Sequence, residues 1–128
     1  MNEAIKFFTT FKTIKLFCQF NQYGETNLLR YFVFKVQNDF LLAIEVNDFE
    51  TGETKFEFKK ATKQSIVELN KNGCFLFDVQ IINSFDESEN EECILFDKLA
   101  IYNNRIEFFQ SIPLMKIDEK ELNSKLIS

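Results

Sequence analysis

The chain has 128 residues, a formal net charge of −5, 17 phenylalanines, three glycines and no histidine. Without histidine, Ser-His-Asp and Cys-His nucleophilic systems and histidine-ligated zinc sites are excluded. The sequence also contains neither GxxxxGK[ST] nor GxGxxG, the glycine-rich loops that cradle phosphate groups, so it favours a non-catalytic binding protein without a cofactor.

The first half of the chain predicts one short helix followed by four strands. Ile5, Phe8 and Phe11 share a helical face within the first dozen residues. From residue 14 the pattern has period two and predicts a strand with Ile14 and the next three alternate residues, through Phe20, on one face. Turn-forming residues at 21–24, 37–39 and 51–52 then separate strands expected over 28–36, 40–46 and 54–59.

The second half predicts a helix, three more strands and a final helix. The helix covers 62–70, and the clearest strand of the chain covers 74–81. A strand over 93–102 changes phase, which indicates a bulge near Asp97 or Lys98. Asn103 and Asn104 then predict a type I′ hairpin turn leading into a strand over 105–110, because asparagine tolerates positive φ. Asp118 is expected to cap the last helix, over 118–125.

This order of elements predicts an α+β fold that is mainly antiparallel. We expect a strongly curved sheet or a partly open β-barrel of about seven strands, with two or three short helices. The length, the single proline and the lack of a linker indicate a single domain over residues 1–128. The nearly continuous apolar run over 28–34 must be covered on both faces, either by a central place in the fold or by a second subunit in a homodimer.

A loop over 84–92 carries the first candidate site, with five carboxylates within seven residues: Asp86, Glu87, Glu89, Glu91 and Glu92. As a calcium loop it would supply alternate oxygen ligands, with Asp97 at the twelfth position. However, Glu91 stands where the sharp turn needs glycine, and the flanking segments are expected to be strands. The remaining interpretations are a solvated hairpin tip and an electrostatic docking surface for a basic protein.

Asp78 and Asp97 form the best candidate carboxylate pair, because both are expected on the polar faces of neighbouring strands. Acid–base chemistry would need their pKa values to be pushed apart, and no third group nearby in sequence favours this, so we expect both to face water. Cys18, Cys74 and Cys93 have no CxxC spacing and are interpreted as buried thiols in a reducing compartment. No metal site is therefore assigned.

A small basic group, Lys55, Lys59, Lys60 and Lys63, is opposed in sequence only by Glu57. A solvated edge between a strand and a helix explains it, and an alternative is a site for an anionic small ligand such as a cyclic nucleotide. Lysines without arginines are poor bidentate phosphate ligands. With only two arginines and no basic face, nucleic acid is not expected as a partner.

The expected location is the cytoplasm, because the sequence shows neither a signal peptide nor a stretch apolar enough to span a membrane. The abundance of residues with AT-rich codons favours a bacterial or phage source. Residues 1–64 carry a charge of +1 and residues 65–128 a charge of −6. The sequence therefore predicts charge-steered binding to a basic partner, as in an immunity protein, a secretion-type chaperone or an inhibitor of a host factor, through the acidic loop together with Asp78 and Asp97. The alternative is a small β-barrel sensor that binds an anionic ligand through the four lysines.

Overall fold

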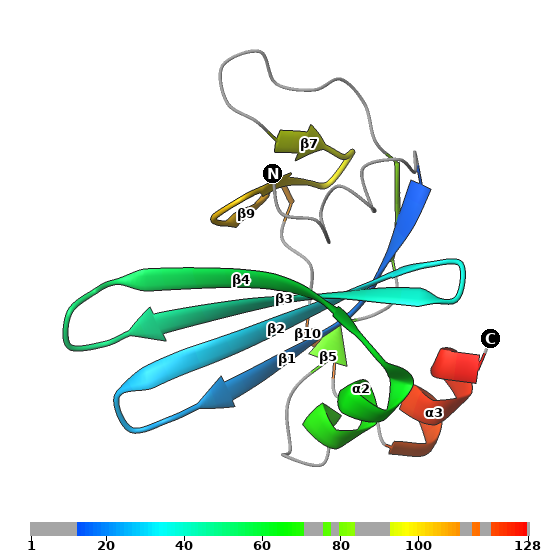
Figure 1. The fold of residues 1–128 in the computed structure, drawn as a ribbon, viewed down its shortest axis with the longest axis horizontal. Helices are drawn as coiled ribbons and strands as arrows, with labels where there is room; N and C mark the ends of the chain where they lie inside the picture. Colours follow the sequence, from blue (N-terminus) through cyan, green and yellow to red (C-terminus); the bar gives the residue numbers. More distant parts are fainter. Residues whose placement is uncertain are drawn as a thin grey trace.

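The computed structural model describes residues 13–70, 76–77, 80–83, 93–110, 114–115 and 119–127. Its central element is a five-stranded antiparallel sheet with the order β4-β3-β2-β1-β6 (Figure 1). The strands are β1 (Thr13–Tyr23), β2 (Asn27–Val36), β3 (Asp39–Asp48), β4 (Thr54–Ala61) and β6 (Gln80–Asn83). Strands β1 to β4 form a meander, as the alternating residues and short turn sequences predict.

The turns that join these strands are short. Gln37 and Asn38 connect β2 to β3, and Gln37 has a φ of 52°, in the left-handed region. Gly52, with a φ of 73°, supplies the left-handed residue between β3 and β4. Because the β2–β3 turn contains only two residues, it sets the register of the two central strands, which begins with Val36 opposite Asp39.

Strand β1 contains a bulge that the alternation conceals. Leu16 lies opposite Phe34, but Cys18 lies opposite Val33, so Phe17 is an extra residue. The prediction that the alternate residues from Ile14 to Phe20 share one face is therefore wrong. Ile14 and Leu16 enter one core, and Cys18 and Phe20 enter the core on the other face of the sheet, because an extra residue inverts the direction of every later side chain.

A smaller sheet covers one face of the central sheet. It consists of β7 (Cys93–Leu95), β8 (Leu99–Tyr102) and β9 (Ile106–Phe108), all antiparallel. The single bulged strand predicted over 93–102 is thus a hairpin, whose turn is closed by a 2.8 Å hydrogen bond from the Phe96 N–H to the Leu99 carbonyl oxygen.

The predicted hairpin at Asn103 and Asn104 is confirmed, since the Tyr102 N–H donates to the Arg105 carbonyl oxygen at 2.9 Å. Its predicted type is wrong. Neither asparagine has a positive φ, which a type I′ turn requires at both central positions.

Two helices cover the opposite face of the central sheet. They are α2 (Lys63–Asn70), which confirms the helix predicted after β4, and α3 (Glu119–Ile127), which confirms the final helix. In Figure 1 the β7–β9 sheet lies above the central sheet and the two helices lie below it. The core on the helical side includes Phe20, Val33, Leu42, Ile66 and Leu122. The core on the other side includes Leu16, Phe32, Phe34, Phe96 and Leu99. Strand β2 is therefore covered on both faces within the chain over residues 32–36, whereas its residues 27–31 are half-buried.

The strand expected over 74–81 is divided into two elements. Strand β5 (Leu76–Phe77) pairs with β10 (Leu114–Met115) in a separate two-stranded sheet, whereas β6 pairs with β1. The helix predicted over the first dozen residues and the Asp118 cap predicted for the last helix lie outside the described residues.

The fold is α+β, mostly antiparallel sheet with few short helices. Two of the seven expected strands are divided, and β10 is additional. Within the described ranges, the pairing runs from β4 to β6 and does not close the central sheet into a barrel. None of the helices that the structure describes is long and apolar enough to cross a membrane.

Candidate binding sites

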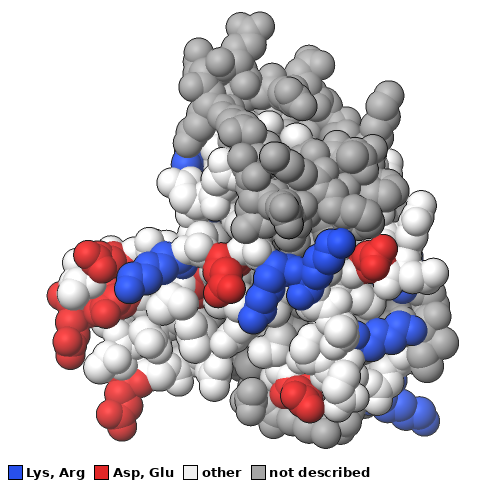
Figure 2. All heavy atoms as spheres, viewed as in Figure 1, with Lys and Arg blue, Asp and Glu red and all other residues white. Residues whose placement is uncertain are grey.

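One end of the central sheet carries a cluster of acidic side chains. Residues 23–27, which contain the turn from β1 to β2, and residues 48–53, which contain the turn from β3 to β4, meet there, because the Phe49 N–H donates to the Thr26 carbonyl oxygen at 2.9 Å. We call these two segments the acidic tip. They contain four carboxylates and no lysine or arginine: Glu25, Asp48, Glu50 and Glu53. Figure 2 shows acidic atoms gathered over this end of the sheet, at the left of the view.

Asp48 organises the β3–β4 turn within the acidic tip. Its Oδ1 atom accepts the N–H groups of Glu50 at 2.8 Å and of Thr51 at 3.1 Å. The hydrogen bonds from Thr51 and then from Glu50 lower the pKa of the Asp48 carboxyl group, because they favour its charged form. The remaining three carboxylates of the tip are exposed. The tip is therefore a defined turn that presents negative charge to solvent.

Two exposed aromatic side chains accompany this charge. Tyr23 is 68% exposed and Phe49 is 58% exposed, and both belong to the acidic tip. Across the part of the chain that the structure describes, Phe109 is the one further large hydrophobic residue with such exposure. Aromatic residues are enriched among the side chains that dominate the energy of protein–protein interfaces. The tip thus combines long-range attraction for a basic surface with apolar groups for contact.

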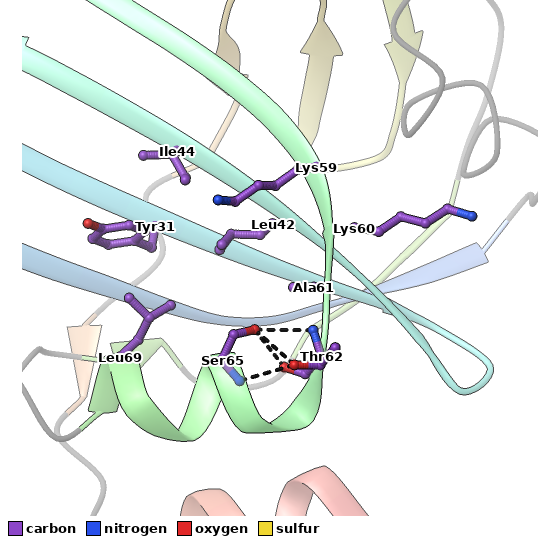
Figure 3. Close-up of a pocket in the computed structure, with 9 residues that line it drawn as sticks. All are labelled: Tyr31, Leu42, Ile44, Lys59, Lys60, Ala61, Thr62, Ser65 and Leu69. Carbon is purple, nitrogen blue, oxygen red and sulfur yellow. Dashed lines mark hydrogen bonds between the residues drawn. The ribbon is translucent and has the colours of Figure 1, made fainter.

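A groove of about 500 Å³ lies between α2 and the helical face of the central sheet. Figure 3 shows its lining residues, which come from β2, β3, β4 and α2: Tyr31, Leu42, Ile44, Lys59, Lys60, Ala61, Thr62, Ser65 and Leu69. Lys59 extends over the groove toward the side that holds Tyr31 and Ile44, whereas Lys60 points away from it (Figure 3). The groove is therefore apolar at its base, with one ammonium group directed across it.

The register of β4 explains why the two adjacent lysines differ. Lys59 lies opposite Leu42, on the helical face of the sheet, and Lys60 lies opposite Leu41, on the other face. Among described residues, Lys59 makes no hydrogen bond or ion pair. Its ammonium group is therefore available to a ligand.

The polar groups of α2 at the groove are already paired. Ser65 N–H donates to the Thr62 hydroxyl oxygen at 3.2 Å, and Thr62 N–H donates to the Ser65 hydroxyl oxygen at 3.1 Å (Figure 3). This reciprocal pair satisfies backbone donors at the start of the helix, in the manner of a capping box. Thr62 and Ser65 therefore line the groove with polar groups that are already paired, and Lys59 supplies the charged group for a ligand.

An ion pair that the sequence analysis missed lies on the opposite face of the sheet. Arg30 Nε donates to Glu45 Oε1 at 2.7 Å, and a terminal nitrogen of the same guanidinium lies 2.5 Å from that oxygen. The side-chain amide of Asn47 also donates to Glu45. Glu45 is 4% exposed, so this ion pair is a buried structural element of the central sheet.

The residues predicted to bind a basic partner fall mostly outside the described residues. These are Asp78, Asp86, Glu87, Glu89, Glu91 and Glu92. Asp97 is described and exposed, but it lies in the turn between β7 and β8. Its expected place within a strand is therefore wrong, because the phase change there marks a turn.

The four predicted lysines are not all brought to one face. Lys55 and Lys59 lie on the helical face of β4, Lys60 on its other face, and Lys63 begins α2. Strand β4 is the edge of the central sheet, and charged side chains on an edge oppose pairing with another chain. Lys55 and Lys60 fit this structural role, whereas Lys59 also lines the groove.

The described residues contain no group of three Asp, Glu or Cys placed to hold a metal ion. Cys18 and Cys93 are buried, as predicted, and burial raises the pKa of the Cys18 thiol, which keeps it protonated. Cys74 lies outside the described residues. No protein-family model, no curated protein and no solved structure matches the chain.

Proposed function

We propose that this protein is a non-catalytic binding module that docks to a basic partner protein by charge steering. The observation that carries the proposal is the acidic tip, which combines four carboxylates with two exposed aromatic residues, Tyr23 and Phe49. The partner class is the one expected from the sequence, and the acidic tip is a second candidate docking surface beside the acidic loop at 84–92.

The two kinds of side chain have different effects on binding. Carboxylates on one end of the molecule raise the association rate with a positively charged surface, and salt screens that effect. Exposed aromatic rings supply contact area that slows dissociation once the surfaces meet. A rigid pair of hairpin turns also loses little conformational freedom on binding. The module would then act by blocking a surface of the partner, as an inhibitor or immunity protein does, or by keeping the partner bound, as a chaperone does.

The test is capture of a partner from a lysate of the source cells on immobilised protein, at low and high salt. The tip variant carries Glu25→Gln, Glu50→Gln and Glu53→Gln, and it leaves Asp48 intact because Asp48 holds the turn. A matched control neutralises three carboxylates outside the tip, through Asp39→Asn, Glu57→Gln and Glu68→Gln. We expect one basic protein to be retained by wild type and by the control, and to be lost by the tip variant and at high salt.

A second variant separates charge from contact. Phe49→Ser should leave the salt dependence of capture intact and shorten the lifetime of the complex, since it removes an anchor and no charge. Capture that is equal for the wild type and the tip variant, or that falls equally with the control, would contradict the assignment of the tip as the docking surface.

A further inference from the structure

We propose that the groove between α2 and the central sheet binds an amphiphilic carboxylate, namely a free medium-chain fatty acid. This ligand and this site are independent of the acidic tip. The inference rests on three properties of the groove: its size, its apolar base and its single unpaired ammonium group.

The size and base of the groove fit an apolar body. Its volume of about 500 Å³ lies within the range of roughly 300–1,000 Å³ that is typical of small-molecule sites. Leu42, Ile44 and Leu69 supply apolar side chains from both walls, with the ring of Tyr31 beside them (Figure 3). Covering such a base with an alkyl chain removes apolar surface from water on both partners.

The charge of the groove fits a single anionic head group. Lys59 extends across the opening and has no partner among the described residues, whereas Thr62 and Ser65 are bonded to each other. Glu57 lies on the same face of β4, opposite Ile44, and repels an anion there. The head group is placed at the ammonium group of Lys59, which extends toward Ile44 and Tyr31, and the alkyl chain extends over Leu42 toward Leu69 (Figure 3).

These features distinguish the ligand from a nucleotide. A phosphate group is usually held by several donors, such as a bidentate arginine or a series of backbone N–H groups. The groove lining contains two lysines, of which only Lys59 is directed across the groove (Figure 3), and no arginine, and the hydroxyl groups of Thr62 and Ser65 at its edge are already bonded to each other. A carboxylate carries a single negative charge, which the one ammonium group of Lys59 balances.

The experiment is an NMR titration of the ¹⁵N-labelled full chain with four probes, the two charged amphiphiles below their critical micelle concentrations and the alcohol below its solubility limit. Octanoate, octan-1-ol and octyltrimethylammonium share one tail and differ in head-group charge, and cyclic AMP tests the nucleotide alternative. We expect octanoate to shift the amide signals of Lys59, Ala61 and Ser65 and to bind at least about fivefold more tightly than octanol. The cationic probe should bind more weakly than octanol.

Matched variants connect the binding to Lys59. Lys59→Met keeps the length of the side chain and should weaken octanoate binding about fivefold while leaving octanol unchanged. Lys55→Met removes the same charge from the same face of β4, outside the groove lining, and should leave octanoate binding unchanged. Melting temperatures of both variants show whether the fold is retained.

Several results would overturn the inference. These are no octanoate shifts at the groove, octanol binding as tightly as octanoate, equal losses in the two lysine variants, or cyclic AMP binding more tightly than octanoate. Because every one of these readouts is a shift at the groove amides, none of them depends on the partner expected for the acidic tip.

Discussion

Removing Arg30 should destabilise the fold by leaving a buried carboxylate without its main partner. Glu45 is 4% exposed, and its Oε1 atom accepts Nε of Arg30 at 2.7 Å. Breaking a fully buried ion pair costs about 3–5 kcal/mol. The Arg30 side chain is 35% exposed, so solvent screens part of the interaction, and we expect Arg30→Met to lower the free energy of unfolding by roughly 1.5–3 kcal/mol.

A double-mutant cycle isolates the contribution of the ion pair. In Glu45→Leu the guanidinium of Arg30 can still reach water, so this change should cost less than Arg30→Met. The double variant should be more stable than the sum of the single losses predicts, by about 1–2 kcal/mol. The contact of Arg30 with the Phe32 ring, at 5.4 Å, is lost in both backgrounds and cancels.

The assay is urea unfolding at neutral pH, followed by circular dichroism. A loss below about 0.5 kcal/mol in Arg30→Met, which is the usual range for a surface change, would refute the reasoning. So would purely additive losses in the cycle, because additivity would mean that Glu45 does not depend on Arg30.

Three further predictions concern stability. Ile66→Ala, on the buried face of α2 at 0% exposure, should cost about 2–5 kcal/mol in urea unfolding, and a loss under 1 kcal/mol would show that α2 is not anchored there. Hydrogen bonding lowers the pKa of Asp48, so ionised Asp48 stabilises the fold above its ordinary pKa and this contribution is lost as pH falls through the folded-state value. Asp48→Asn should therefore lose less stability on acidification than wild type, and equal acid profiles would contradict this. Burial, and then the charges of Lys15 and Lys63, lower the pKa of Lys35 in the folded state. Charged Lys35 therefore destabilises the fold at a pH below the folded-state pKa, and this cost disappears as the pH rises from that value to the unfolded-state pKa. Lys35→Met should raise stability at neutral pH, by an amount that shrinks as pH approaches the ordinary lysine pKa of 10.5; a gain that is constant with pH would exclude this cause.

The strands of the central meander were predictable because their signals are local. Alternation and short turns specify neighbouring antiparallel strands without knowledge of the rest of the chain. The register depends on the length of each turn. The turn predicted over 37–39 would place Val36 opposite Phe40, and hence Arg30 opposite Val46. The structure confines this turn to Gln37 and Asn38, which places Arg30 opposite Glu45, so the buried ion pair was missed by one residue of turn length.

The bulge and the extra hairpin were harder to predict, because both produce the same change in sequence. An inserted residue and a tight turn each shift the phase of period two. In β1 the bulge at Phe17 is hidden, because Cys18 and Phe20 continue the alternation of apolar residues that Ile14 and Leu16 begin, although they face the other core. At Asp97 and Lys98 the phase shift was visible, but only long-range pairing decides that the chain turns back there.

The groove depends on tertiary packing, which the pattern does not contain. The four lysines lie within nine residues of sequence, and the directions of Lys55, Lys59 and Lys60 follow from the register of β4. The selection of Lys59 alone requires knowing that α2 folds back over Leu42 and Ile44. The acidic tip could have been found from sequence, because its carboxylates lie in two turns that the meander brings to one end of the sheet.

The two proposed sites should act independently, because they lie at different places on β3 and β4. Lys59 is opposite Leu42, and the acidic tip begins beyond the Asn47–Thr54 pair, five residues further along β3. At roughly 3.3 Å per residue, about 17 Å separates them, which is beyond the distance at which substitutions usually couple. The tip variant should therefore bind octanoate as wild type does, and saturating octanoate should leave partner capture unchanged. A change of more than about threefold in either measurement would mean that the sheet transmits occupancy from the groove to the tip, and the groove would then be a regulatory site for docking.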